Sequence, residues 1–275
     1  MQAETRTYRV NGIDMCVRVA GAGPEVLLVH GFPDTHVIWR KQVPALVAAG
    51  YRVIAPDNRG TGESAISPNV ADYRLDNLVA DLLGLLDALD VAKVRLVAHD
   101  WGAIIGWQLA ARHPERVDRY VALSVGHPRA YASDPVQWLH AWYVFLIQLP
   151  WLPERLLAAG DWRGMARLAG WVDEIPAWRA SLARPGRLTA ALAYYRANLH
   201  LLWRGDVPPV RVPVLGVWSS GDRFLTERQM VASARFVRAP WRYVRIDGAN
   251  HWMQLTAVEA VNALLLGYLR PMEVR

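Results

Sequence analysis

One stretch of the chain, residues 94–111, most constrains the fold. A β-type run over residues 94–98 passes through a turn centred on Asp100 and enters a helical pattern directly. Such a tight turn needs small residues on both sides of its centre, and Ala98 and Gly102 supply them. The turn would lift the Asp100 side chain above the edge of a sheet. The stretch therefore predicts a strand, a sharp elbow with a carboxylate at its tip, and a helix.

Short β-type runs alternate with amphipathic helical stretches over much of the chain, which is typical of an α/β fold with a mostly parallel sheet flanked by helices. A hairpin is expected at Asn11-Gly12, between runs 8–10 and 15–19. The stretch 75–89 carries leucines on one helical face. The candidate core strands are Val26–His30, Arg52–Ala55, Val94–Ala98, Tyr120–Ser124, Val214–Trp218 and Tyr243–Ile246.

The alternation stops between about His127 and Asp206, where helical patterns are interrupted by prolines. An interval of this length between two sheet strands predicts an inserted lid. We expect residues 1–126 and 206–275 to form an α/β core and residues 127–205 to form a helical lid, or cap. Tryptophans gather between Trp138 and Trp203, and we expect them to line an apolar cavity.

Composition narrows the classes of partner. The net charge is +6, but the arginines are scattered and no basic block occurs, which argues against nucleic acid. The chain has no long apolar run and no secretory signal pattern, so we expect a cytoplasmic protein without membrane insertion. The single cysteine, Cys16, cannot form an internal disulfide, and we expect it to be buried. We expect no cofactor and no metal, and a homodimer stays open.

Two further residues follow strand-like runs in the order of a catalytic triad. Asp222 comes after the run 214–218, and His251 comes after the run 243–246. In this arrangement the Asp100 carboxylate forms an ester with an electrophilic carbon. His251 then deprotonates the water that cleaves the ester, and Asp222 orients the imidazole.

Each of these residues also has a structural interpretation. Asp100 could cap the following helix, Asp222 could be a turn aspartate, and His251 could be a buried, hydrogen-bonded histidine. Their common order along the chain favours the triad. His99, His127 and His200 are weaker candidates for the base.

The run 26–29 leads into His30-Gly31-Phe32-Pro33. A loop at this place supplies one backbone N–H to a developing oxyanion, and the residue after the nucleophile supplies the other. We therefore expect an oxyanion hole from the amides of Phe32 and Trp101. We also expect Phe32, Trp101 and Trp252 to contact substrate. The stretch Asp57–Gly62 resembles a phosphate loop but lacks the following lysine, so it predicts a structural turn.

Two tyrosines of the predicted lid lie on apolar helical faces. One face carries Leu188, Leu192, Tyr195, Leu199 and Leu202, and another carries Leu139, Tyr143, Leu146 and Pro150. Tyr194 points elsewhere. A phenol on an apolar face needs a partner for its hydroxyl, and a substrate oxygen could be that partner. On periodicity alone, packed lid aromatics remain an equal alternative.

Over residues 8–268 the sequence resembles the epoxide hydrolases of the α/β-hydrolase superfamily. The motifs that carry the resemblance are His30-Gly31-Phe32-Pro33, His99-Asp100-Trp101-Gly102, Gly221-Asp222, Asn250-His251-Trp252 and the segments around Tyr143 and Tyr195. The resemblance implies that Tyr143 and Tyr195 donate hydrogen bonds to the epoxide oxygen. It also implies an ether-bond hydrolase that uses water to convert a small apolar or aromatic epoxide to a vicinal diol through an aspartyl ester.

Other functions remain as alternatives. Haloalkane dehalogenases also use an aspartate nucleophile, but they carry an asparagine where this chain has Phe32. Fluoroacetate dehalogenases have arginines just after the nucleophile that are absent here, and Asp100 itself excludes serine esterases as close models. A non-catalytic receptor for an apolar ligand is a further alternative, because fold alone does not settle function. The complete set of Asp100, Asp222 and His251 argues against it.

Overall fold

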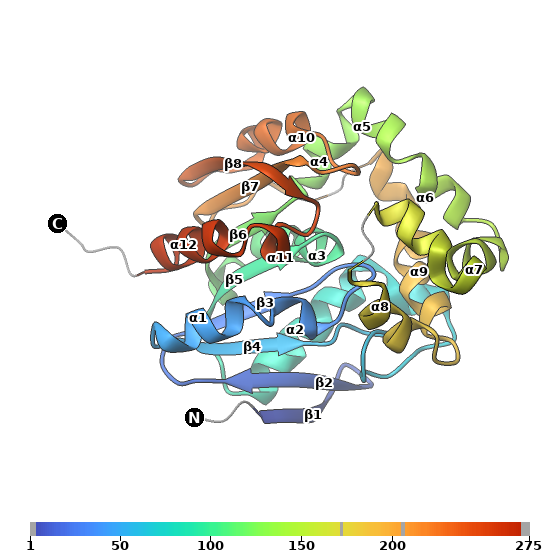
Figure 1. Ribbon diagram of the computed structural model, residues 1–275. Helices are drawn as coiled ribbons and strands as arrows, with labels where there is room; N and C mark the ends of the chain where they lie inside the picture. Colours follow the sequence, from blue (N-terminus) through green and yellow to red (C-terminus); the bar gives the residue numbers. More distant parts are fainter. Residues whose placement is uncertain (1–3, 171–172, 205–206, 271–275) are drawn as a thin grey trace.

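The computed structural model describes residues 4–170, 173–204 and 207–270, and its centre is an eight-stranded sheet (Figure 1). The strand order is β1-β2-β4-β3-β5-β6-β7-β8. Strand β2 runs antiparallel to β1 and β4, and all other neighbours are parallel. The predicted α/β fold with a mostly parallel sheet is confirmed. The strands are β1 (Glu4–Val10), β2 (Ile13–Ala20), β3 (Glu25–Val29), β4 (Arg52–Pro56), β5 (Val94–His99), β6 (Val117–Leu123), β7 (Val214–Gly221) and β8 (Trp241–Asn250).

The predicted hairpin joins β1 and β2. Val10 pairs with Ile13, and the turn residues Asn11 and Gly12 have φ angles of 41° and 79°. A two-residue turn with both φ angles positive matches the twist of the flanking strands, and Asn-Gly adopts it at little cost.

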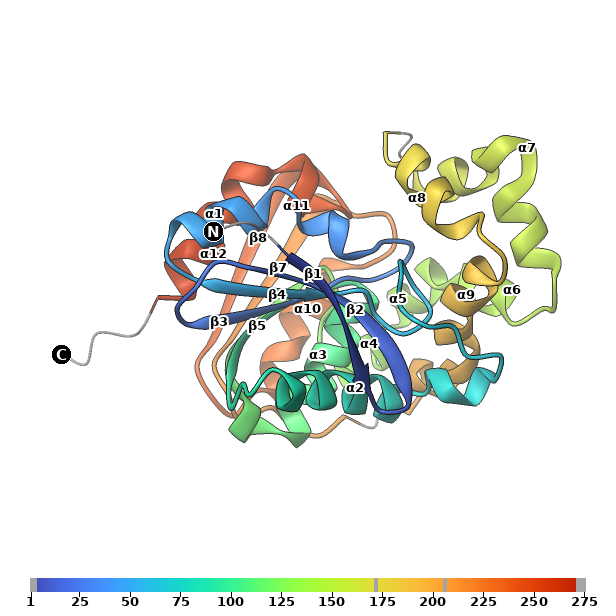
Figure 2. The same cartoon turned by 90° about the horizontal axis from the view of Figure 1, so that it is seen from below.

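Helices cover both faces of the sheet, so its central strands are apolar and buried. Figure 2 shows α1 (Gln42–Ala48), α11 (Met253–Thr256) and α12 (Val258–Tyr268) on one face. Helices α2 (Leu75–Ala88), α3 (Trp101–Arg112) and α10 (Glu227–Ala232) lie on the other. Short 3-10 turns complete the core: η1 (His36–Trp39), η2 (Val70–Tyr73), η3 (Pro114–Arg116) and η5 (Ser233–Phe236).

A run of helices, here called the inserted helices, connects β6 to β7. They are α4 (Pro128–Ala132), α5 (Pro135–His140), α6 (Trp142–Ile147), α7 (Leu152–Ala169), α8 (Ile175–Leu182), α9 (Arg187–Ala197) and the 3-10 turn η4 (Leu199–Leu202). Helices α6 to α9 stand together to one side of the sheet (Figures 1 and 2). The boundary predicted at residues 205 and 206 lies outside the described residues.

The predicted helical faces of this region need correction. The stretch 188–203 is not one helix, because α9 ends at Ala197 and Asn198 leaves helical geometry with φ of −124°. The stretch 139–150 is divided between α5 and α6, so Leu139 is 74% exposed and does not share a buried face with Tyr143. Contacts with the core, rather than helical periodicity, set these breaks.

No helix in the described ranges is long and apolar enough to cross a membrane. Cys16 lies on β2 and is buried, as expected.

Candidate active site

The elbow after β5 holds Asp100 in an unusual backbone conformation, with φ of 53° and ψ of −124°. Non-glycine residues adopt this region only where the surrounding structure enforces it. Two glycines make room for the turn. A Cβ atom at Gly102 would lie 2.2 Å from the carbonyl oxygen of Val29, and one at Gly31 would lie 2.3 Å from Oδ1 of Asp100 itself.

The Asp100 carboxylate lies against two backbone amides. The N–H of Phe32 donates to Oδ1 at 2.7 Å, and the N–H of Trp101 also stabilises the charged form. Burial raises the pKa of Asp100, but His251, His99 and the Trp101 amide together outweigh it and bring the pKa below its ordinary value. The carboxylate is therefore ionised, and both amides predicted for the oxyanion hole lie at its oxygens.

His251 lies between two carboxylates. Its Nε2 is 3.5 Å from Oδ2 of Asp100, and its Nδ1 is 2.8 Å from Oδ2 of Asp222. The other oxygen of Asp222 accepts hydrogen bonds from the amides of Phe224 and Leu225, which fix its orientation. Burial lowers the pKa of His251, but the two carboxylates outweigh this effect and raise the pKa to about 10. The structure thus brings the three predicted triad residues together.

The histidine loop is supported by Ser124, which sequence reasoning did not assign, and by His99, which it gave as a weaker candidate for the base. The carbonyl oxygen of His251 accepts hydrogen bonds from Nε2 of His99 at 2.9 Å and from Oγ of Ser124 at 3.2 Å. Burial lowers the pKa of His99 to about 3, so its ring is neutral and its proton is held on Nε2 for this bond. The end of β5 is therefore tied, with the loop after β6, to the loop after β8 beneath the site.

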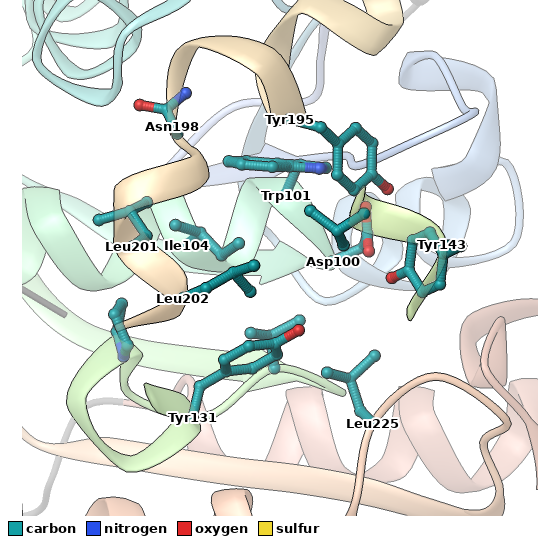
Figure 3. Close-up of a pocket in the computed structure, with 13 residues that line it drawn as sticks. Asp100, Trp101, Ile104, Tyr131, Tyr143, Tyr195, Asn198, Leu201, Leu202 and Leu225 are labelled. Carbon is teal, nitrogen blue, oxygen red and sulfur yellow. The ribbon is translucent and has the colours of Figure 1, made fainter. Parts of the chain in front are cut away.

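Tyr143 on α6 and Tyr195 on α9 face the same cavity as Asp100 (Figure 3). Their ring centroids are 6.1 Å apart, and the Tyr195 ring meets Trp101 edge-on at 5.0 Å. Burial raises the pKa of both phenols well above the ordinary value, so both are neutral hydrogen-bond donors. Tyr194 turns away, as predicted, and donates to the carbonyl oxygen of Arg59.

Arg196 holds the two tyrosine-bearing helices in register. Its guanidinium donates to the carbonyl oxygens of Ile147 and Leu149 at the end of α6, both at 3.0 Å. It also pairs with Glu154 of α7 at 2.8 Å. Because Arg196 follows Tyr195 directly, this network fixes the spacing of the two phenols.

The cavity has two adjoining chambers that share Asp100, Tyr143 and Tyr195. We call the first the aliphatic chamber, because its wall includes Ile104, Val125, Val144, Leu201, Leu202 and Leu225. The second, the aromatic chamber, includes Phe32, Ile147, Met165, Phe224, His251 and Trp252. The three residues predicted to contact substrate all lie in these walls: Phe32 and Trp252 in the aromatic chamber and Trp101 in the aliphatic one.

The expected wall of lid tryptophans is wrong for the described residues. Trp142, Trp151 and Trp203 are 59%, 60% and 49% exposed, and Trp138 is also at the surface. Trp162 and Trp178 are buried but line neither chamber. Trp171 lies outside the described residues. The inserted helices contribute mainly tyrosines and aliphatic side chains to the two chambers instead.

Asp34 is a further residue that sequence reasoning missed. It is 4% exposed and accepts hydrogen bonds from the indole N–H groups of Trp178 on α8 at 2.8 Å and of Trp252 at 3.0 Å. Burial is the main cause that raises its pKa, to about 7. Because Asp34 belongs to the loop of Phe32, one carboxyl group joins the oxyanion loop, the histidine loop and an inserted helix. Its place in His-Gly-Phe-Pro-Asp was the only available signal.

Within the described part of the chain, no group of three or more His, Cys, Asp or Glu side chains is arranged to hold a metal ion. The groups gathered around the cavity are a carboxylate, an imidazole and phenols. Such groups can perform nucleophilic and acid–base chemistry.

Comparisons with known proteins agree with this geometry. The family model of the alpha/beta hydrolase fold matches residues 24–170. The chain is 32% identical to epoxide hydrolase A of Mycobacterium tuberculosis, over 98% of both proteins. The crystal structure of epoxide hydrolase A from Mycobacterium thermoresistibile superposes with a TM-score of 0.88 at 29% identity, covering 100% of both chains. A Bacillus megaterium epoxide hydrolase mutant in complex with a diol product gives a TM-score of 0.86 at 25% identity, over 96% of this chain and 99% of that one. The chain belongs to the epoxide hydrolases of the α/β-hydrolase superfamily.

Proposed function

We propose that this protein hydrolyses an apolar or aromatic epoxide to a vicinal diol, with Asp100 as nucleophile and an aspartyl ester as intermediate. One observation carries the proposal: an ionised carboxylate shares a cavity with two neutral phenols, and its Oδ2 lies 3.5 Å from Nε2 of a histidine that is paired with a second aspartate.

In the first step, a carboxylate oxygen of Asp100 attacks one epoxide carbon and the bond from that carbon to the epoxide oxygen breaks. The oxygen leaves as an alkoxide, which is a poor leaving group without a proton donor. Tyr143 and Tyr195 both line the cavity beside Asp100 and can supply the hydrogen bond and the proton. The product of this step is a hydroxyalkyl ester of Asp100, and the tyrosine regains its proton from solvent.

The second step needs His251 as a neutral base, although its pKa of about 10 makes it a cation in the free protein. Ester formation neutralises Asp100, which is one of the two carboxylates that raise this pKa. The pKa of His251 therefore falls, and the ring releases its proton to solvent, which replaces the proton that the tyrosine takes up. It can then take a proton from water as the water attacks the ester carbonyl, while Asp222 stabilises the imidazolium that forms.

The attack places negative charge on the carbonyl oxygen of the ester. The amides of Phe32 and Trp101, which bond the carboxylate in the free protein, would stabilise this oxyanion. Collapse of the tetrahedral intermediate breaks the ester C–O bond, and the imidazolium gives its proton to the departing alkoxide, which completes the diol. The Asp100 carboxylic acid that remains passes its proton to the neutral His251, which restores the carboxylate and the imidazolium of the free protein.

We further infer that residues 127–205 act as a lid on a core of residues 1–126 and 206–275. The support is that both phenols come from the inserted helices, while the nucleophile, base and acid come from loops that follow core strands. A substrate between them would contact both parts, which reduces its exposure to bulk water and strengthens the electrostatic interactions within the site.

The experiment that tests the proposal uses His251→Gln mixed with styrene oxide. The ester should form but not be cleaved, so mass spectrometry should show one added styrene oxide on the peptide that carries Asp100. The double variant Asp100→Asn/His251→Gln should show no adduct, and His113→Gln, at a partly exposed histidine remote from the triad, should turn over like the wild type.

An adduct on another residue, or a wild type that forms no diol from a panel of epoxides, would overturn the proposal. Release of bromide from haloalkanes by such a protein would identify a dehalogenase instead. Binding of epoxides without any product would indicate a receptor.

A further inference from the structure

A third tyrosine faces the nucleophile. Tyr131 lies on α4, outside the two tyrosine-bearing helices, and lines the aliphatic chamber together with Asp100, Tyr143 and Tyr195. Figure 3 shows its ring extending into this chamber, with its hydroxyl directed inward. Tyr131 does not line the aromatic chamber, where His251 lies. Its hydroxyl therefore belongs to the part of the cavity that holds a substituent of the epoxide rather than the attacking water.

The neighbours of Tyr131 leave its proton available. Burial raises the pKa of Tyr131, and the side chain of Gln137 lowers it again in part. The Gln137 oxygen accepts from the amide of Thr226 at 2.8 Å, and its nitrogen donates to the carbonyl of Phe224 at 2.7 Å. Because this nitrogen carries a second proton, it is the group that can stabilise the phenol oxygen. The phenol then acts as an acceptor toward Gln137 and keeps its own proton for another partner.

Apart from Asp100, Tyr143 and Tyr195, which the proposed reaction uses, the side chains that line the chamber offer few acceptors for that proton. Most of its wall is aliphatic, and Asn198 has its polar groups engaged: the oxygen accepts from Leu75, and the nitrogen donates to the carbonyls of Tyr73 and Tyr194. A buried donor without an acceptor costs free energy, and phenylalanine would fill the same space without that cost. A hydroxyl here is therefore suited to an acceptor atom of a bound ligand.

We propose that Tyr131 is a specificity-determining residue that donates a hydrogen bond to an oxygen on the side chain of the epoxide. The proposal rests on the proposed function and deepens it, because Tyr143 and Tyr195 already flank Asp100 for the epoxide oxygen itself. It names a substrate class: epoxides that carry an ether or carbonyl oxygen near the ring, such as glycidyl ethers and esters, in preference to hydrocarbon epoxides of the same shape.

The test compares pairs of epoxides that differ only in these oxygens. Phenyl glycidyl ether is matched with 4-phenyl-1,2-epoxybutane, and glycidyl butyrate is matched with 1,2-epoxyoctane. kcat/KM is measured for all four with the wild type, Tyr131→Phe and Tyr268→Phe. Tyr268 is the matched control, because its buried hydroxyl has no hydrogen-bond partner among the described residues and it lies on α12, away from the cavity.

We expect Tyr131→Phe to lower kcat/KM about tenfold for the oxygen-bearing member of at least one pair, which is the size of one lost hydrogen bond. The loss should appear mainly in KM, and the hydrocarbon partner should change less than twofold. Tyr268→Phe should leave all four values unchanged. Melting temperatures of the variants show whether both still fold.

The possible outcomes distinguish a failure of the Tyr131 proposal from a failure of the proposed function. A wild type that opens none of the four epoxides contradicts the proposed function. If the wild type opens them and Tyr131→Phe slows both members of each pair equally, Tyr131 acts in packing or as a third donor to the epoxide oxygen, and the specificity role is wrong. Unchanged values for all four would equally overturn it.

Discussion

The imidazole of His251 is placed between two carboxylates, and its charge depends on both. Asp222 bonds Nδ1 at 2.8 Å, and Asp100 lies 3.5 Å from Nε2. Of these two carboxylates, only Asp100 changes charge during the proposed reaction. At the residue scale, formation of the ester would therefore activate the base. The covalent bond that neutralises Asp100 also lowers the pKa of His251, which must act next.

Asp100→Asn reproduces the neutral state of the ester and should lower the pKa of His251 from about 10 toward its ordinary value. Side-chain ¹⁵N NMR over pH 5–11 measures this pKa directly. Asp14→Asn, at an exposed carboxylate on β2, should leave it unchanged. An unaltered His251 pKa in Asp100→Asn would show that Asp222 alone stabilises the imidazolium. The proposal that ester formation lowers this pKa would then be wrong.

Gly31 is the residue whose lack of a side chain most directly serves the nucleophile. A Cβ atom there would lie 2.3 Å from Oδ1 and 2.4 Å from Cβ of Asp100, so Gly31→Ala must displace the carboxylate. Because misplacement by about 1 Å can cost on the order of 100-fold in rate, we expect kcat/KM for styrene oxide to fall about that much. Gly267→Ala is the control, since nothing lies within 4 Å of its added atom. Wild-type activity in Gly31→Ala would contradict this account of the elbow.

Sequence reasoning found some site residues and missed others for a physical reason. Asp100, Asp222 and His251 each follow a β-type run, so local pattern and chain order were enough to place them. Asp34 was missed because the indoles that it bonds are 144 and 218 residues away in sequence. Tyr131 was missed because its helix, α4, is only five residues long and shows no periodicity.

At the scale of elements, the core strands were predicted closely but the inserted helices were not. A buried parallel strand is marked by an uninterrupted apolar run, which is local information. The end of α9 is decided by Asn198, whose side chain bonds the backbone of Leu75 and Tyr73 in the core. A contact of this kind overrides the helical pattern and cannot be read from the spacing of leucines.

Asp34 joins an inserted helix to the core, and Asp34→Asn tests this connection. The carboxyl group of Asp34 accepts one hydrogen bond from an indole N–H at each oxygen. Asparagine has only one oxygen, and its amide protons would face the second indole N–H. The melting temperature should therefore fall by several degrees.

The loss should depend on pH. Burial raises the pKa of Asp34 from 3.8 to about 7, so the folded wild type holds a proton that the unfolded chain releases above pH 4. The contribution of this group to the stability of the wild type therefore falls as pH rises from about 4 to about 7. Above about pH 7 this contribution is lost. Thermal unfolding should show a larger advantage over Asp34→Asn at pH 5 than at pH 8. An equal difference at both values would mean that Asp34 is ionised throughout.

At the scale of the whole molecule, the site lies at the interface between the sheet and the inserted helices. Strands β6 and β7 pair in parallel, with Tyr120 opposite Val214, although the inserted helices separate them in sequence. The sheet is therefore continuous beneath the insertion, and the loops that follow its strands converge where α6 and α9 present their tyrosines. Alternating patterns predicted the sheet, but the way in which the insertion packs on it depends on contacts distant in sequence.

The titratable groups at this interface should also set the pH range in which the molecule is stable. The folded-state pKa of His251 is about 10, against an ordinary 6.5, so the folded protein retains a proton that the unfolded chain loses. The contribution is complete below pH 6.5 and disappears as pH rises toward 10. Asp57 and Asp100 act in the opposite sense, because their pKa values are lowered in the folded protein. Their contribution to stability is lost as pH falls, so the protein is also less stable in acid. We expect the wild-type melting temperature to decline by several degrees between pH 6.5 and 10.

His251→Gln should start lower at pH 6.5, because two buried carboxylates lose their cation, and should then show a much flatter decline. His113→Gln, at a histidine away from the triad, should keep the wild-type slope. If His251→Gln kept that slope too, the alkaline loss would come from other groups, such as the buried thiol of Cys16, whose pKa burial raises to about 11. Such a result would mean that the imidazole is neutral in the free protein, and that ester formation is not what turns it into a base.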